Sequence, residues 1–335
     1  MKLPQIPRWS AAVLAAGLSA CSLDHDIATA HAERRAAIDI AGLPALGAYS
    51  RETSATVPLA QRWFDRGLLW TYGFNHAEAA RCFRRAQEAE PGFALAYWGE
   101  ALALGPNINA PLESGNHAAR AFAASREALA RIENASPVER ALIEALAERY
   151  ADPAETPFDA QDRETLDAAY ADAMSAVFAA FPKDPDVGTL FADARMNQRP
   201  WDYWTSKPWE RDGTPKTGIR EALEVLRAVV AMHPEHPGAH HMRIHLCEAS
   251  PFLEEAVSSA DALGGLVPGS GHLVHMPSHA FVRVGRYKDA IDANTAAVAV
   301  DRAYFDRAGP QGTYEFYRAH NHHFRAWVAM YPDVA

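Results

Sequence analysis

The sequence has little positive charge and none of the common catalytic motifs. Its 335 residues include 32 Lys and Arg against 42 Asp and Glu, which gives a formal net charge of -10. An acidic chain without long basic runs argues against nucleic acid, or an anionic membrane surface, as the main partner. No nucleophile elbow, P-loop, HExxH motif or dinucleotide fingerprint is present. The sequence therefore assigns no reaction, and whether the protein is an enzyme stays open.

Cysteine is also scarce, and the first of the three belongs to an N-terminal targeting segment. Residues 1–20 combine a positively charged start with an apolar stretch too short to span a bilayer, and they end in Leu18-Ser19-Ala20 before Cys21. This pattern resembles a bacterial lipoprotein signal. The resemblance implies lipidation of Cys21 and, because Ser22 follows, attachment to the periplasmic face of the outer membrane. An ordinary cleaved signal peptide, which would leave a soluble periplasmic or secreted protein, is the alternative.

The other two cysteines, Cys82 and Cys247, each lie in an apolar helical pattern. This setting favours small buried side chains. An exported protein could also join them in a disulfide, and Cys247 lies close enough to His245 in the sequence to make a metal thiolate the third alternative.

Helical periodicity begins near Gln61 and repeats. Large and small residues alternate at the spacings of a tetratricopeptide repeat (TPR), and the segment 96–101 repeats the first unit 34 residues later. We therefore predict an all-α protein, a right-handed α-solenoid of TPR-like helical hairpins over residues 61–335, preceded by a tether and packing arm over residues 21–60. The positions that carry the first unit are Trp63, Gly67, Trp70, Ala79, Phe83, Ala86 and Pro91.

Two irregularities interrupt this predicted solenoid. A tryptophan-rich insertion at 199–216 contains Trp201, Tyr203 and Trp204, and it is expected either to cover the groove as a lid or to plug a gap between repeats. The last predicted helix, at 313–330, has no partner helix after it. We expect the solenoid either to finish unusually or to continue beyond Ala335.

Histidine is concentrated near the end of the chain, since eleven of the fifteen lie between His233 and His323. Residues four apart on a helix share one face. The repeat register places histidines of three successive helices on the faces that line the concave groove. His272 also faces the groove in this register, whereas His236, His240 and His322 point elsewhere. The predicted metal ligands are His241, His245, Glu248, His275, His279, His320 and His323.

Pro277 lies between His275 and His279 and complicates this prediction. Proline disfavours helical backbone before it, so the helix is expected to start at Pro277, with His275 on the entering loop. Imidazole ligands suit zinc or copper, and the Glu248 carboxylate would also admit iron or manganese. If the site keeps an open position, bound water would be acidified, with Glu248 or Asp193 as the candidate base.

The three histidine segments resemble signature blocks of a bacterial group of TPR proteins, a resemblance that implies the fold and no activity. They are Ala239–His245, His272–His279 and Tyr317–Phe324. Two functions fit these observations. The first is an exported, lipid-anchored protein with a metal site in the groove. The second is a scaffold, similar to outer-membrane assembly lipoproteins of the same repeat, that holds a peptide or protein in the groove and uses its histidines to sense pH.

Overall fold

The structure, a computed structural model, describes residue 40 and residues 43–110, 115–205, 213–309 and 312–331. The predicted signal segment 1–20 and Cys21 lie outside the described residues. Within the described part, each helix is too short or too polar to cross a membrane.

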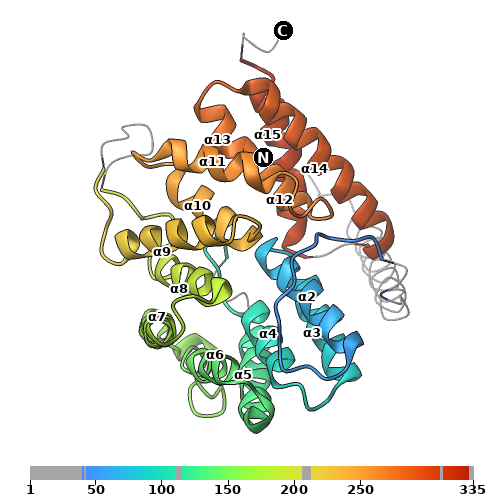
Figure 1. Ribbon diagram of the computed structural model, residues 1–335, viewed down its shortest axis with the longest axis vertical. Helices are drawn as coiled ribbons and strands as arrows, with labels where there is room; N and C mark the ends of the chain where they lie inside the picture. The colour runs from blue at the N-terminus through green and yellow to red at the C-terminus, as the bar shows by residue number, and fades with distance from the viewer. Residues whose placement is uncertain (1–39, 41–42, 111–114, 206–212, 310–311, 332–335) are drawn as a thin grey trace, which may run out of the picture.

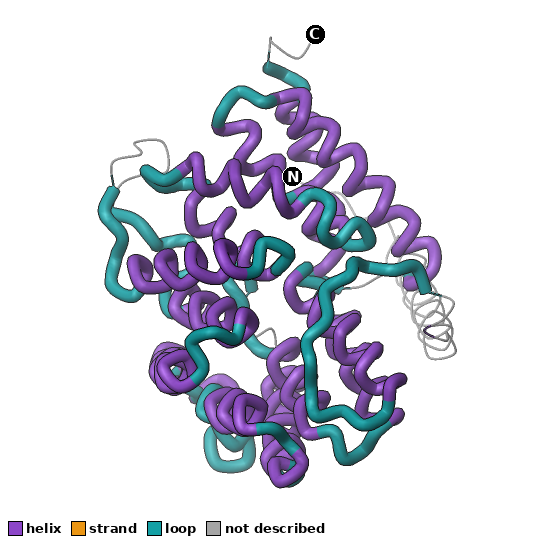
Figure 2. The backbone as a smooth tube through the Cα atoms, viewed as in Figure 1, coloured by secondary structure: helices purple, strands orange, loops and turns teal. Residues whose placement is uncertain are grey.

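The described residues form α-helices joined by short loops, with two short 3-10 helices and two isolated β-bridges (Figures 1 and 2). Consecutive helices pack as antiparallel hairpins, and the predicted fold class, an all-α array of TPR-like hairpins, is confirmed. The helices are α2 Pro58–Tyr72, α3 His76–Ala89, α4 Ala94–Leu104, α5 Gly115–Leu129, α6 Pro137–Ala147, α7 Arg163–Ala180, α8 Pro185–Asn197, α9 Ile219–Met232, α10 Pro237–Cys247, α11 Leu253–Leu263, α12 Gly271–His275, α13 Pro277–Arg283, α14 Tyr287–Ala308 and α15 Tyr314–Val328.

The first two hairpins show why the repeat pattern alternates large and small residues. Phe83 of α3 is fully buried, and its ring lies directly against the backbone of Gly67 and Gly99. A Cβ atom added at Gly99 would lie 2.4 Å from the Phe83 ring, and one at Gly67 would lie 2.8 Å away. Both glycines therefore allow the helices to approach closely around one large side chain.

Gly99→Ala is expected to lower the free energy of unfolding by about 2 kcal/mol, because the added methyl group forces the Phe83 ring out of its place. Urea denaturation of the two proteins measures this difference. Gly265→Ala is the matched control, since nothing lies within 4 Å of a Cβ atom at Gly265. Equal losses for the two substitutions would contradict the packing argument.

The structure agrees with the helix limits that the sequence indicates. The helical segment around Pro277 is divided there into α12 and α13, as the proline rule predicts. The last predicted helix, at 313–330, agrees with α15 to within two residues, and the predicted insertion at 199–216 falls in the connection between α8 and α9.

The N-terminal arm, residues 43–57, runs along α2 and also reaches other hairpins of the array (Figures 1 and 2). Its backbone carbonyl at Leu46 accepts a hydrogen bond from the Gly269 N–H at 3.1 Å, before α12. Arg51 reaches Asp184 at the start of α8 with an N–O distance of 2.8 Å, and the Ser54 N–H donates to Glu139 of α6 at 2.7 Å. The arm therefore connects hairpins that are far apart in the sequence.

The first hairpin also contacts a much later one, so the array curves back on itself. Tyr72, at the end of α2, packs so closely against α10 that a Cβ atom added at Gly238 would lie 2.5 Å from its ring. This contact brings the end of α2 beside the histidines of α10.

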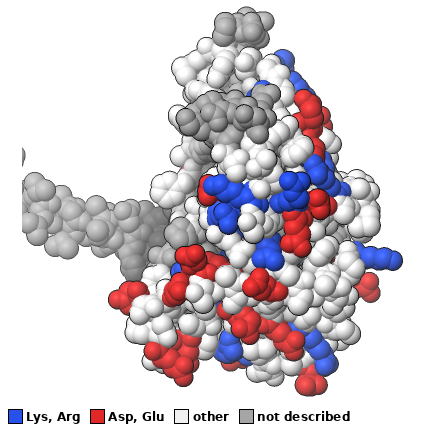
Figure 3. All heavy atoms as spheres, turned by 90° about the vertical axis from the view of Figure 1, so that its left-hand side faces the viewer, with Lys and Arg blue, Asp and Glu red and all other residues white. Residues whose placement is uncertain are grey.

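On the face toward the left of Figure 1, basic and acidic side chains are mixed, and neither sign covers it (Figure 3).

Candidate metal centre

Helix α10 brings the first three histidine nitrogens together with help from α12. His241 and His245 lie one turn apart on α10, and their Nε2 atoms are 3.0 Å apart. His272 of α12 adds a third Nε2 atom, 3.2 Å from that of His241. All three side chains are at most 3% exposed. We call His241, His245 and His272 the first triad.

A second triad, His275, His279 and His320, lies on α12, α13 and α15. The Nε2 atoms of His275 and His279 are 2.9 Å apart, and the Nε2 atom of His320 is 3.5 Å from that of His279. The break at Pro277 does not separate the pair, because Met276 keeps helical dihedrals, φ -51° and ψ -36°. The expectation that His275 would leave the i,i+4 geometry is therefore corrected.

The opposite ring nitrogen of four of these histidines faces an oxygen atom. Nδ1 of His241 lies 2.7 Å from the Tyr72 carbonyl oxygen, which can only accept. Nδ1 of His275 lies 2.7 Å from Oδ1 of Asn294, whose amide nitrogen in turn donates to the Ala290 carbonyl at 2.7 Å. The acceptors fix the hydrogen on Nδ1 and leave the Nε2 lone pair free.

Glu248 provides the remaining two acceptors and occupies both of its oxygens in doing so. Its Oε1 atom lies 3.1 Å from Nδ1 of His245, and its Oε2 atom lies 2.7 Å from Nδ1 of His279. Burial alone would raise the pKa of Glu248, but the imidazoles of His279 and His245 hold it below its ordinary value. Glu248 is thus placed behind the predicted ligands and not among the converging nitrogens, and it joins one histidine of each triad.

Burial disfavours the charged form of an imidazole ring. Burial lowers the pKa of His241, His272 and His275 well below its ordinary value, and it lowers the pKa of His320 to about 4. Neutral imidazoles with hydrogen on Nδ1 point lone pairs at one another across about 3 Å, which repels in the absence of a cation. Each triad therefore has the donors and the spacing of a metal site, and the nitrogens within each lie within 4.8 Å of one another.

The two triads are neighbours. The ring centroids of His245 and His279 are 6.1 Å apart, and those of His272 and His275 are 6.0 Å apart. Each of these contacts joins one triad to the other, in addition to the shared Glu248 carboxylate. Two ions bound here would lie side by side.

Aromatic rings form the walls around the triads. Phe74 contacts His241, His245 and His272, with centroid distances between 4.6 and 6.0 Å. Phe324 covers His275 and His279 at 5.4 and 5.0 Å. Both triads therefore pack against apolar rings, and His279 and His320 keep partial exposure.

The tryptophan-rich insertion divides into a buried part and a part above the first triad. Tyr203 and Trp204 are buried, and the Trp204 indole N–H donates to the Leu246 carbonyl at 2.8 Å, as a plug between repeats would. Trp201 is 51% exposed, and its ring lies 5.1 Å from that of His245. The two expected roles, plug and lid, thus fall on different residues of the insertion; residues 206–212 lie outside the described part.

Several other predicted or considered residues lie away from the converging nitrogens. His322 and His323 are exposed on α15. His240 points the other way, with its ring nitrogens 3.1 Å from Ser259 and 2.9 Å from the Pro234 carbonyl. Cys82 and Cys247 are buried free thiols, and burial raises the pKa of each to about 12. The disulfide and thiolate alternatives therefore have no support in the geometry.

Asp193, the other candidate base, lies in a separate small cavity. This cavity, of about 30 Å³, is lined in part by Tyr72, Met242 and Phe74, and Phe74 also contacts the first triad. Burial raises the pKa of Asp193 to about 6. The carboxyl group lies behind the aromatic wall and outside both groups of converging nitrogens.

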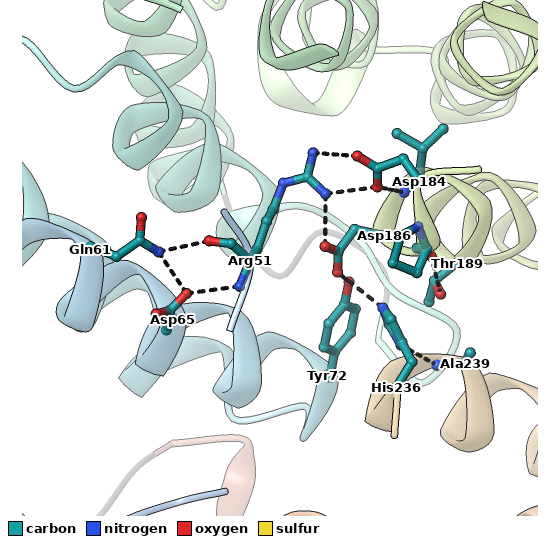
Figure 4. A network of polar contacts seen from close by, with 11 residues as sticks. Arg51, Gln61, Asp65, Tyr72, Asp184, Asp186, Thr189, His236 and Ala239 are labelled. Atoms are coloured by element: carbon teal, nitrogen blue, oxygen red, sulfur yellow. Dashed lines mark hydrogen bonds and ion pairs between the residues drawn. The ribbon is translucent and has the colours of Figure 1, made fainter. Parts of the chain in front are cut away.

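A buried network supports the first triad from behind (Figure 4). Asp186 of α8 accepts hydrogen bonds from the Tyr72 hydroxyl and from Nε2 of His236 at 3.1 Å, and it pairs with Arg51 at 2.7 Å. Nδ1 of His236 accepts from the Ala239 N–H at 3.0 Å and caps α10. Asp186 thereby fixes the residue whose carbonyl binds His241 and also the start of the helix that carries it.

The sequence analysis did not identify Asp186, Tyr72 or Arg51 as part of the site. The aspartates on either side of Pro185 mark a helix start, which Asp184 caps by accepting the Val187 N–H at 3.0 Å, so the signal indicated a cap and no more. Arg51 lies in a segment without periodicity, and nothing in its neighbourhood indicates a partner 135 residues away.

No family model matches the sequence, and no curated protein is significantly similar to it. Among solved structures, the chain is similar to YrrB, described as a TPR protein with an unusual peptide-binding site. The sequence identity is 16%, the TM-score is 0.33, and the match covers 66% of this chain and 93% of YrrB.

Proposed function

We propose that this protein binds two transition-metal ions, one in each histidine triad. The observation that carries the proposal is the convergence of Nε2 atoms at 2.9 to 3.2 Å, while the Nδ1 atoms of four of the six rings donate to Tyr72, Glu248 and Asn294. Outer partners of this kind are typical of histidines that ligate a metal, since they fix the tautomer and orient the ring. A cation would replace the repulsion between lone pairs by three coordinate bonds.

Zinc and copper suit this donor set best. All six donors are imidazole nitrogens, which bind late first-row metals well. Glu248 was considered as an oxygen ligand that would admit iron or manganese, but both of its oxygens accept from imidazoles. Because Glu248 lies behind the ligands, its carboxylate does not offer an oxygen donor to an ion that prefers oxygen.

The alternative, a scaffold that touches a peptide through its histidines, is less well supported. Four of the six triad side chains are buried, the other two are partly buried, and Phe74 and Phe324 pack against the rings. A peptide in the groove would meet other residues first. Export and a lipid anchor at Cys21 remain part of the proposal on the strength of the N-terminal pattern.

Metal analysis after purification through a tag without histidine tests the proposal. We expect two zinc or copper ions per chain, and about one after either His241→Ala or His279→Ala, because each substitution removes a ligand of one triad. His323→Ala is the control, since His323 is exposed and outside both triads, and it should keep both ions. A metal-free protein whose thermal stability does not change on adding zinc or copper would refute the proposal.

A further inference from the structure

The inference drawn here rests on the proposed function and concerns what two ions in adjacent triads would bind. The charge of the buried site limits which ions it can hold. Among the described residues, Glu248 is the carboxylate that bonds to the triad imidazoles. The six converging donors are imidazole nitrogens, which carry no charge when they ligate a metal. Two divalent ions would carry four positive charges into a buried site with one negative charge, whereas two monovalent ions would carry two. Burying an uncompensated charge costs several kcal/mol, so the site favours monovalent ions.

Copper(I) is the ion that combines this low charge with affinity for imidazole nitrogen. Three nitrogens from each triad hold one ion and leave a further position open, as in metal sites that bind a substrate directly. His245 and His279 lie across from each other at 6.1 Å between ring centroids, and Glu248 links them. The open positions of two neighbouring ions can thus be shared by one small bridging molecule.

The walls restrict what that molecule can be. Phe74, Phe324 and Trp201 lie against the imidazoles, and an aromatic enclosure disfavours a charged or strongly hydrated substrate. Phe74 and Trp201 are the two described residues other than glycine with positive φ, at 55° and 63°, and both rings contact His245. Such backbone costs of order 1 to 3 kcal/mol and persists where the surroundings enforce it. The surrounding structure therefore holds these two rings against the site despite the unfavourable backbone energy.

The same geometry disfavours hydrolysis by metal-bound hydroxide. Attack by water requires a group that takes up its proton, and both oxygens of Glu248 already accept from His245 and His279. Asp193 lies in the separate cavity behind Phe74. A small neutral molecule that accepts electrons and needs no proton fits better.

We propose that the two triads form a dicopper centre that binds dioxygen between the ions. Each copper(I) ion gives one electron and becomes copper(II), and dioxygen takes up both electrons to become peroxide bound to the two ions. No bond to hydrogen forms or breaks, and both oxygen atoms stay together. Removing dioxygen returns the electrons to the copper ions, so the step reverses without another reductant.

The test loads the full-length protein with two equivalents of copper(I) without air, then measures dioxygen uptake with an oxygen electrode and the copper(II) signal by electron paramagnetic resonance. We expect one dioxygen per two copper ions and a copper(II) signal below a tenth of that of two isolated ions, because the two spins pair through the bridge. His272→Ala and His320→Ala each remove one ligand of one triad and should reduce uptake at least tenfold. His323→Ala on the same helix as His320 should not change it.

The outcomes separate this inference from the proposed function. A chain that retains neither copper nor zinc contradicts the metal site itself, whereas one that retains zinc but no copper keeps the metal site and overturns the dioxygen centre. If the chain retains two copper ions but takes up no dioxygen, or oxidises to two copper(II) ions that give full signal intensity, the metal site stands and the dioxygen centre is overturned.

Discussion

Lowering the pH from 7 to 4.5 is expected to unfold the metal-free protein. Burial lowers the pKa of four imidazoles of the site, those of His241, His245, His272 and His275, relative to the ordinary value of 6.5. The unfolded chain therefore binds more protons than the folded one below pH 6.5. Stability is complete above that pH and is lost as the pH falls toward the pKa values of the folded state.

The expected loss is large because the four groups act together. A proton that only the unfolded chain takes up costs about 1.4 kcal/mol of stability per pH unit below 6.5. Four such rings therefore cost on the order of 5 kcal/mol over one pH unit, which is comparable with the stability of a typical domain. Urea denaturation at pH 7.5 and pH 5 measures the change. His323→Gln is the control and should behave as the parent, since that ring is exposed. A free energy of unfolding that is the same at both pH values would show that the imidazoles are accessible to protons in the folded state.

Metal-loaded protein should resist acid further. An ion on the Nε2 atoms must be displaced before the rings accept protons, and binding to the folded chain alone adds stability. The difference in acid midpoint between loaded and metal-free protein should disappear when one ligand from each triad, His241 and His279, is replaced together.

Asp186→Asn is expected to lower the free energy of unfolding by about 3 kcal/mol. The substitution keeps the shape of the side chain and removes its charge, so Arg51 loses one of its two carboxylates while buried, and the His236 and Tyr72 donors face a weaker acceptor. Burial would raise the pKa of Asp186, but the hydrogen bond from His236 and the Arg51 guanidinium hold it below its ordinary value. The carboxylate is therefore charged at neutral pH, and its replacement removes that charge.

The same substitution should weaken metal binding at one triad more than at the other. Asp186 fixes Tyr72, whose carbonyl binds His241 of the first triad, and it has no bond to the second triad. Loss of such outer support lowers metal affinity roughly 10- to 100-fold. Competition with a coloured chelator measures each ion. Asp172→Asn, at an exposed aspartate paired with Arg195, is the control. Equal weakening at both triads would mean that Asp186 stabilises the fold without positioning the site.

The sequence predicted the helices and most of the nitrogens because both depend on local period. His241 and His245 follow from i,i+4 spacing and converge as expected. His275 and His279 keep the same geometry through the break at Pro277, which the proline rule did not predict. His320 and His323 are three residues apart, so an error of a fraction of a turn in the register decides which one faces inward, and His320 does. The repeat register turns His272 toward the groove without marking it as a ligand, yet its Nε2 atom completes the first triad.

The position of Glu248 depends on tertiary packing and could not be predicted. Its spacing from His245 indicated a shared helix face, which suits a ligand and an outer acceptor equally. The contact that distinguishes these two roles comes from His279, whose Nδ1 atom on a different helix bonds to Oε2 of Glu248. The positive φ of Phe74 has no sequence signal either, since it follows Gly73, the residue that such a turn would normally use.

The N-terminal arm changes how this molecule should come apart. In an ordinary linear array each hairpin depends only on its neighbours, and the terminal ones peel away first. Here the arm, residues 43–57, is bonded to α6, α8 and the α11–α12 connection, and α2 packs against α10. Detachment of the arm would separate Arg51 from Asp184 and Asp186 and disturb the middle of the chain as well. We therefore expect the hairpins to unfold in one cooperative transition. Folding should be slow, because the contact between α2 and α10 joins segments more than a hundred residues apart in the sequence.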